Sequence, residues 1–379
     1  MRRQFYICIV CSLFASLWLA GCRGDESAPQ PVMPESTDTP VTERPTLPPP
    51  AVAAVASATL PPTEPPPTAL PTPTTTAEST VTPPPPATNT PVPPPTEPPP
   101  TPTAEAIYPA WLNYLNRFRT MGGLAPLSEQ AALTLGSELH SQYMVVNDAA
   151  VSHEEDPGNP FYNEAGDQAA RNGNVFATSM VEADYVWGIN FWASAPFHLV
   201  PMLSPRLERV GFGDYNEAGG SVGMAAVLDV RSERNTGTTA PGYPLLFPGD
   251  GSTTWIGRHN LFEWPDPLTS CPGYARPSGP PIVIQLGDGD IVPIVGGHAL
   301  LMGDTPVDTC LFDETTYTNP DIWAEKTGRQ ILDNQDAIVI IPRSPLVAGE
   351  TYTAQVEVNG QRYTWQFNAV ASPDEVPSN

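Results

Sequence analysis

Two short glycine-rich segments have the spacing of known catalytic or metal-binding motifs. Residues 219–223 read Gly-Gly-Ser-Val-Gly and match the G-x-S-x-G pattern of hydrolases, in which Ser221 would be the nucleophile. That chemistry requires a strand before the serine and a helix after it, whereas residues 223–230 have the composition of a strand. Residues 286–290 read Leu-Gly-Asp-Gly-Asp, without the remaining ligands of a calcium loop. We therefore expect a turn between two strands at each segment, and no catalytic role for Ser221.

The cysteines fall into two groups along the chain. Cys8, Cys11 and Cys22 lie near the N-terminus, and Cys271 and Cys310 lie in the last third. An even pair of cysteines in an exported protein indicates a disulfide rather than a metal site. A bond between Cys271 and Cys310 would close a loop of about 40 residues and stabilise the fold by about 4 kcal/mol on the chain-entropy model. The alternative is two free thiols.

The first 22 residues have the features of a secretory signal. Arg2 and Arg3 precede an apolar stretch, residues 5–20, that is too short for a permanent membrane span. The stretch ends in Leu-Ala-Gly-Cys22, which resembles the lipobox of bacterial lipoproteins. The resemblance implies that residues 1–21 are a removed signal peptide and that Cys22 carries lipid, which would hold the protein on the extracellular face of the cell membrane. The alternative is an ordinary cleaved signal.

Composition separates residues 22–104 from the rest of the chain. Between residues 27 and 103 lie 27 of the 50 prolines, mixed mainly with threonine and alanine. Such a segment cannot bury enough apolar surface to fold, so we expect a disordered, extended linker. The whole chain has a formal net charge of −24 with only 17 lysines and arginines. This balance excludes nucleic acid as a partner and disfavours adhesion to anionic membrane surfaces.

The remaining residues divide by pattern into further segments. Residues 105–230 alternate between helix and strand patterns, with expected helices at 109–121 and 129–146 and a third around Ile189. Pro109 suits a first turn, Ser128 is the expected cap of the second helix, and strands are expected at 210–213 and 223–228. A Gly/Pro-rich connector, 231–281, an all-β domain, 282–370, and a disordered tail, 371–379, follow.

Within residues 105–230 several ordered segments resemble the CAP superfamily, which includes cysteine-rich secretory, antigen 5 and pathogenesis-related proteins. The matching segments are Leu-Asn-Arg-Phe-Arg at 115–119, Gly-Leu-Ala-Pro-Leu at 123–127, Ser-His at 152–153, Trp-Ala-Ser-Ala-Pro-Phe-His at 192–198, Met-Leu-Ser-Pro at 202–205 and Val-Gly-Phe-Gly at 210–213. The resemblance covers a third of the chain. It implies an α/β fold in which a sheet lies between helices, an α-β-α sandwich.

The resemblance also implies a cleft with two histidines and two acidic residues, sometimes with a bound divalent metal. By position in the motifs the histidines are His153 and His198, whereas the family's Gly-Glu-Asn segment appears here as Gly173-Asn174-Val175, with the glutamate missing. The candidate substitutes are Glu154, Glu182 and Asp184. Two imidazoles could contribute to a zinc site, which needs about four ligands, or they could brace the cleft by hydrogen bonds. We expect the other three histidines, His140, His259 and His298, to lie outside the site.

The expected all-β domain contains β-branched runs bounded by turns. Runs at 282–286, 291–295, 337–341 and 351–358 predict strands, and Asn359-Gly360 predicts a type I′ hairpin with a partner strand at 362–367. Residues 342–358 resemble the end of bacterial immunoglobulin-like domains, which implies a β-sandwich used for display or adhesion.

Together these features favour a surface-anchored lipoprotein with a non-enzymatic CAP domain. Its ligand would be a small apolar molecule, a peptide or a cell-wall glycan. Two alternatives remain open: a metal-assisted hydrolase or peptidase that uses His153 and His198, and a structural cell-wall display protein.

Overall fold

The computed structural model describes residues 108–149, 151–237 and 242–376. The expected signal peptide, Cys22 and the whole of the expected linker, 22–104, lie outside these residues. The α-helices are α1 Ala110–Met121, α2 Ala131–Val146, α3 Glu164–Asn172, α4 Tyr185–Ser194, α5 Pro196–Met202 and α6 Ile322–Asp333. Two short 3-10 helices are η1 Pro267–Ser270 and η2 Pro373–Glu375. None of the helices in the described ranges is long and apolar enough to span a bilayer.

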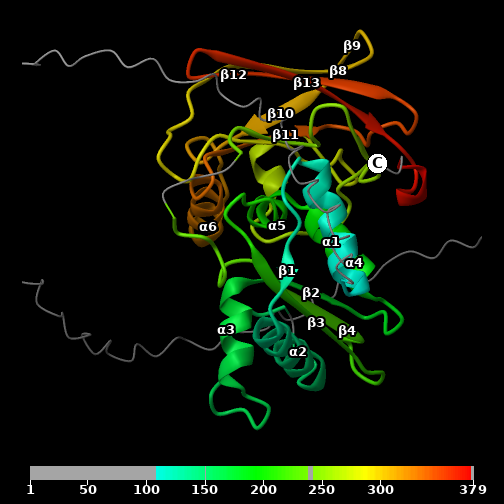
Figure 1. Cartoon of the computed structure of the whole chain (residues 1–379), viewed down its shortest axis with the longest axis vertical. Helices are drawn as coiled ribbons and strands as arrows, with labels where there is room; N and C mark the ends of the chain where they lie inside the picture. The colour runs from blue at the N-terminus through cyan, green and yellow to red at the C-terminus, as the bar shows by residue number, and fades with distance from the viewer. Residues whose placement is uncertain (1–107, 150, 238–241, 377–379) are drawn as a thin grey trace, which may run out of the picture. The chain divides into compact units, whose positions relative to one another are not determined.

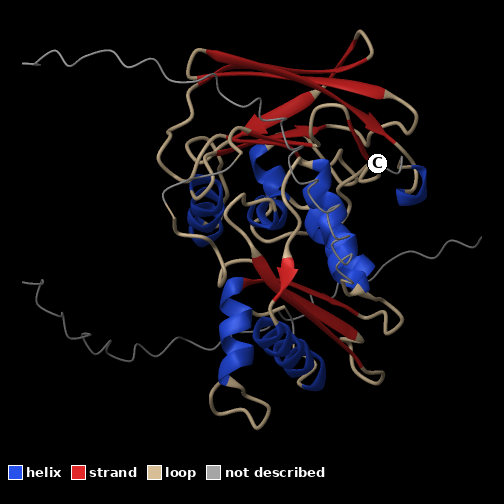
Figure 2. Ribbon diagram, viewed as in Figure 1, coloured by secondary structure: helices blue, strands red, loops and turns tan. Residues whose placement is uncertain are grey.

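The first sheet lies between two layers of helices (Figure 2). Its strand order is β1-β3-β4-β2, with β1 Ser128–Glu129, β2 Gly173–Thr178, β3 Arg209–Asn216 and β4 Met224–Asp229. One face packs on α2 and α3 through Val145, Ala169 and Val227, and the other packs on α1 and α4 through apolar side chains such as Trp192 and Leu228. The expected α-β-α arrangement is therefore present.

Helix α2 begins later than its sequence predicts. Ser128 and Glu129 pair in parallel with Arg209 and Val210, and the Gln130 N–H continues this pairing by donating to the Val210 carbonyl oxygen. The helix then starts at Ala131, so the expected capping role of Ser128 is wrong. The backbone groups of Ser128 pair with β3 at the edge of the sheet instead.

Two further sheets face each other and form a sandwich (Figure 1). The second sheet has the order β10-β11-β7-β5, with β5 Leu245–Phe247, β7 Ile282–Gln285, β10 Thr309–Phe312 and β11 Ala337–Pro342. The third has the order β6-β13-β12-β8-β9, with β6 Ser252–Thr254, β8 Val295–Met302, β9 Thr305–Val307, β12 Thr351–Val358 and β13 Gln361–Ala369. The expected hairpin at Asn359 and Gly360 is confirmed, since both residues have positive φ, 52° and 75°.

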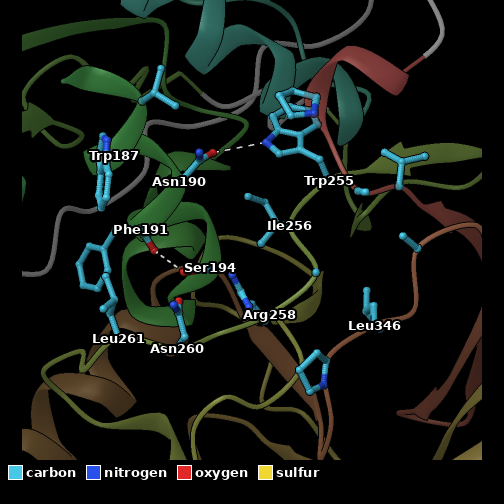
Figure 3. Close-up of a pocket in the computed structure, with 17 residues that line it drawn as sticks. Trp187, Asn190, Phe191, Ser194, Trp255, Ile256, Arg258, Asn260, Leu261 and Leu346 are labelled. Carbon is cyan, nitrogen blue, oxygen red and sulfur yellow. Dashed lines mark hydrogen bonds between the residues drawn. The ribbon is translucent and has the colours of Figure 1, made fainter. Parts of the chain in front are cut away.

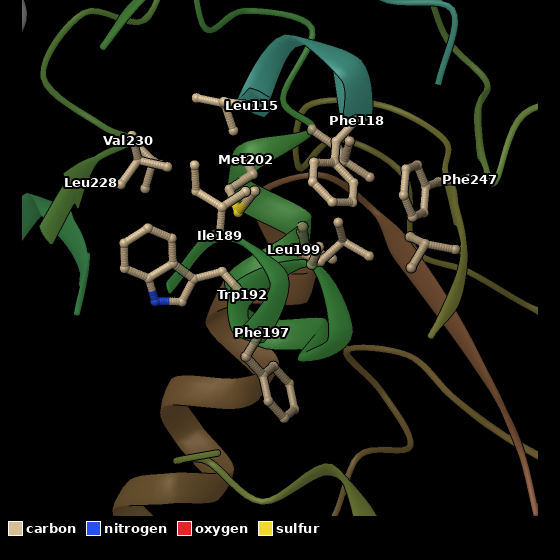
Figure 4. Packing of buried hydrophobic residues seen from close by; sticks show 14 of the residues in the cluster. Leu115, Phe118, Ile189, Trp192, Phe197, Leu199, Met202, Leu228, Val230 and Phe247 are labelled. Carbon is tan, nitrogen blue, oxygen red and sulfur yellow. The ribbon is translucent and has the colours of Figure 1, made fainter. Parts of the chain in front are cut away.

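The second sheet is shared by two hydrophobic cores. Along β7, Ile282 and Ile284 face the third sheet, while Val283 between them packs toward the helices of the first layer. This alternation follows from the two-residue period of a strand, and it leaves the sheet buried on both faces. The core on the helix side is continuous from α1 to β11, and Figure 4 shows Phe247 of β5 beside Phe118 of α1. The described residues belong to one compact unit, Thr96–Asn379.

Three expectations for the C-terminal half are corrected. Residues 282–370 are not all-β, because α6 lies within them, with the Asp321 side chain capping its first turn. Residues 291–294 are not a strand, and β8 begins only at Val295. Residues 371–376 carry η2, and the Pro373 carbonyl oxygen accepts a hydrogen bond of 2.5 Å from Arg117, so this part of the expected tail is fixed to α1.

The expected connector, residues 231–281, contributes two strands, β5 and β6, to the two C-terminal sheets. Each has only three residues, which is too short for a periodic pattern to be visible in sequence. The expected disulfide joins Cys271 after η1 to Cys310 in β10, with the Cα atoms 5.6 Å apart.

Candidate functional site

His198 is held in place by a buried carboxylate. Pro196 occupies the first turn of α5, which places His198 near the N-terminus of the helix. The His198 Nδ1 lies 2.7 Å from Glu263 Oε1, and its backbone N–H donates to the same oxygen over 3.1 Å. Glu263 is 0% exposed and His198 is 12% exposed. Burial raises the pKa of Glu263, while its hydrogen bonds with His198 oppose that rise.

His153 is fixed by a backbone carbonyl. It lies in the loop after α2, and its Nδ1 lies 2.9 Å from the Ala170 carbonyl oxygen near the end of α3. The side chain is exposed at the cavity mouth, yet the protein atoms around the ring lower its pKa below 6.5. A neutral ring donates through Nδ1 to Ala170, so Nε2 is left with a lone pair. In both histidines Nδ1 is occupied by the protein, and Nε2 is the nitrogen available to a ligand.

The two histidines line a cavity of about 460 Å³, called the apolar cavity below. Its remaining walls come from β2, α4 and the 261–264 segment: Val151, Val175, Phe176, Ala177, Phe191, Leu261, Phe262, Glu263 and Trp264. Phe262 and Trp264 at its edge are 81% and 54% exposed. Eight of the eleven lining residues are apolar, which is typical of a site for a small molecule.

Two further cavities adjoin the apolar cavity. One of about 240 Å³, the arginine cavity, shares His153, His198 and Trp264 with it and is lined also by Arg171 and Arg231. On the opposite side, an open cavity of about 600 Å³ shares Phe191 and Leu261 with the apolar cavity. Figure 3 shows this open cavity between α4, which carries Trp187, and the segment that carries Arg258. The shared residues make the three cavities neighbours along one groove.

The acidic residues proposed from sequence do not line the apolar cavity. Glu154 is 72% exposed and lies 3.7 Å from Arg171, Glu182 is exposed, and Asp184 caps α4 by accepting from the Val186 N–H over 3.0 Å. Asn174, in the segment from which the family's glutamate is missing, donates to the His198 carbonyl oxygen over 2.9 Å. It therefore braces α5 and contributes no negative charge.

Sequence reasoning missed Glu263, the carboxylate that does contact a site histidine. It lies 65 residues after His198, in the segment interpreted as a connector. The available signal was a single acidic residue inside an apolar run, Leu261-Phe262-Glu263-Trp264. A charge in such a run needs a partner when the run is buried, and that partner could not be identified from spacing alone.

The donor set falls short of a zinc site. Among residues 108–149, 151–237 and 242–376, no group of three or more His, Cys, Asp and Glu side chains is arranged to hold a metal ion. A histidine whose second nitrogen is held by a carboxylate or carbonyl is the usual arrangement around a metal ligand, and both histidines have it. However, Glu263 Oε1 is engaged by His198, so the site offers two nitrogens where zinc takes three or four protein ligands.

The other candidate residues serve the fold. His140 is buried against Glu155, as expected for a packed histidine, and His298 lies 3.1 Å from the Thr309 hydroxyl. His259 is buried, its Nδ1 lies 2.8 Å from the Ser194 carbonyl oxygen, and burial lowers its pKa to about 4. Ser221 lies between β3 and β4 and donates to Asp148 over 2.9 Å, and no helix follows it, so the hydrolase geometry is missing.

Residues 112–229 match the model of the cysteine-rich secretory protein (CAP) family. The match runs from α1 to the end of β4 and includes both site histidines, so this part of the chain is a CAP domain. Glu263 and the two C-terminal sheets lie beyond it. No match to the chain was found among curated proteins.

Proposed function

We propose that this chain is a lipid-anchored protein of the extracellular membrane face whose CAP domain binds a small apolar ligand. The observation that carries the proposal is the composition of the apolar cavity, whose eleven lining residues include four aromatic side chains, Phe176, Phe191, Phe262 and Trp264, and two histidines. In ligand sites of this kind the apolar walls provide affinity, and a few polar groups set the orientation of the ligand.

The edge of the cavity supports a binding role. Phe262 exposes most of its surface to water and Trp264 about half, although both residues line an apolar cavity. A ligand in the cavity would cover part of both rings, and burying an aromatic side chain contributes about 1.5–3 kcal/mol. These two residues are therefore expected to supply much of the binding free energy.

Binding can be tested by titrating the purified protein with dodecanol, an uncharged apolar ligand, in a calorimeter. We expect Phe262→Ala and Trp264→Ala each to weaken binding at least about tenfold, since tenfold corresponds to about 1.4 kcal/mol. Phe161→Ala is the matched control, because Phe161 is also exposed but does not line the cavity. If dodecanol does not bind, or if the control weakens binding as much, the proposed site is wrong.

The anchor is tested separately from the ligand. Cys22→Ser should move the protein from the membrane fraction to the soluble fraction of the cells that produce it, and should abolish incorporation of labelled fatty acid. Continued membrane attachment of the variant would contradict lipidation at Cys22.

A second candidate function is hydrolysis at the histidines. The 2.7 Å contact between His198 and Glu263 is that of a general base oriented by a carboxylate. The apolar cavity contains no Ser, Thr or Cys side chain, so water would have to be the nucleophile. Turnover of a p-nitrophenyl ester that His198→Ala abolishes, together with stoichiometric zinc in the purified protein, would favour the metal-assisted form of this reaction over simple binding.

A further inference from the structure

Five of the twelve arginines in the described part of this acidic chain have no carboxylate within 4.0 Å. Seven of the described arginines form ion pairs within 4.0 Å: Arg171, Arg206, Arg209, Arg276, Arg329, Arg343 and Arg362. Arg117 and Arg119 donate to backbone carbonyls instead. Within the described ranges only Arg231, Arg234 and Arg258 have neither a carboxylate within 4.0 Å nor a carbonyl acceptor, in a chain with 41 acidic residues. Each of the three lines the groove or the recess at its end.

Arg231 lies next to the two site histidines. It follows β4 and lines the arginine cavity together with His153 and His198. The nearest acidic residue in sequence, Asp229, is engaged elsewhere, because its carboxylate accepts from the backbone N–H groups of Arg231 and Ser232 and from the Ser232 hydroxyl. The Arg231 guanidinium therefore forms no ion pair within 4.0 Å, although the charge of Asp229 acts on it at longer range.

Arg234 adds a second positive charge beside Arg231. Both residues line a small recess that continues from the arginine cavity, together with Asn334 and Gln335. The Arg234 Nε is buried and has no acceptor. Desolvation by the surrounding protein atoms and the charge of Arg234 lower the pKa of Arg231, while the Asp229 carboxylate opposes this shift. Two like charges and an unpartnered donor indicate a site that gains stability when an oxyanion enters.

We infer that Arg231, together with Arg234, binds the carboxylate or phosphate head of an amphiphilic ligand whose apolar part occupies the apolar cavity. This inference rests on the proposed function and specifies its ligand. The two cavities meet at His153 and His198, so one molecule can reach both. A guanidinium recognises either oxyanion through paired N–H donors.

The opposite orientation would place the head at Arg258. Both arginines are exposed, but Arg258 lies alone in the open cavity (Figure 3), whereas Arg231 has a second guanidinium and two imidazoles close to it. The two neighbouring guanidinium groups favour the arginine cavity. Arg258 is therefore a matched comparator for Arg231, with the same side chain and the same lack of a carboxylate partner.

The test compares ligands that share a tail and differ in the head. Dodecanoate, dodecyl phosphate and dodecanol are titrated into the purified protein at pH 8. We expect the two anions to bind at least about tenfold more tightly than dodecanol, with a preference that shrinks as salt is added. Arg231→Gln should abolish the preference and leave dodecanol affinity unchanged, Arg234→Gln should reduce it, and Arg258→Gln should retain it.

The possible results separate the two proposals. Equal affinities of the wild-type protein for all three ligands, or loss of the preference in Arg258→Gln but not in Arg231→Gln, would overturn the inference and leave apolar binding intact. If inorganic phosphate alone binds as tightly as dodecyl phosphate, the arginine cavity is a site for free anions. The proposal of an amphiphilic ligand would then be wrong. Failure of all three ligands to bind would refute the proposed function, and the inference with it. Thermal unfolding of each variant verifies that it folds.

Discussion

A buried pair beside the groove, His140 and Glu155, yields the sharpest prediction for stability. Both side chains are fully buried, and His140 Nδ1 lies 3.0 Å from Glu155 Oε1. The other carboxylate oxygen accepts from the Asn163 N–H over 2.8 Å, and His140 Nε2 donates to the Ser152 carbonyl oxygen over 2.9 Å. The pair therefore joins α2 to the loop that carries His153.

His140→Ala leaves the Glu155 carboxylate buried without this partner. Removing one member of a buried charged pair typically costs about 3–5 kcal/mol. For a unit of this size each kcal/mol lowers Tm by about 2–4 °C, so we expect a fall of about 6–20 °C. Glu155→Ala should cost a similar amount, while the double variant should cost less than the sum of the two, because no unpaired charged side chain then remains.

Urea denaturation of the four proteins measures these free energies of unfolding. Glu154→Ala is the matched control, since Glu154 is the adjacent residue but its ion pair is exposed and should contribute under about 0.5 kcal/mol. A loss below about 1 kcal/mol in His140→Ala, or strict additivity in the double variant, would refute the reasoning.

Three further predictions concern other parts of the fold. Gly211→Ala should destabilise the protein by about 3 kcal/mol in urea denaturation, because the added Cβ would overlap the backbone of α2 at Leu133, and an unchanged stability would contradict that close approach. Reduction of the Cys271–Cys310 bond should cost about 4 kcal/mol, since it frees a 39-residue loop in the unfolded state, and a Tm unaffected by reductant would argue against the bond. His259 binds a proton near pH 6.5 when unfolded but only near pH 4 when folded, so stability should fall by roughly 3 kcal/mol as the pH drops across this range. His259→Gln should lose less stability over the same range, and an identical pH profile would show that His259 is not the cause.

The CAP domain could be predicted from sequence because its elements are long and periodic. The helices at 110–121 and 185–194 carry apolar residues at helical spacing, and β3 and β4 are apolar runs. Helix α6 was missed although a signal was present, namely Asp321 at the cap position and Glu325 in the first turn. Its first two residues, Ile322 and Trp323, are exposed, which conceals the apolar face.

The candidate site could be predicted only in part, for a different physical reason. His153 and His198 were found by their place in family motifs, and both line one cavity. Glu263 could not be found in this way, because its partner is set by the packing of a distant segment and no local pattern records that contact. The arginine cavity is a similar case, since only the folded chain brings Arg231 to the two site histidines.

The continuous core beneath the second sheet has a practical consequence for protein production. A fragment limited to the family match, residues 112–229, would lack the strands that cover Phe197 and Phe118. It would expose an aggregation-prone apolar surface to solvent. We therefore expect the family match and the residues that follow it to unfold in a single calorimetric transition. Neither part is expected to fold when it is moved alone into another chain. A related chain without the C-terminal half would need a different set of side chains on the apolar surface that this half covers.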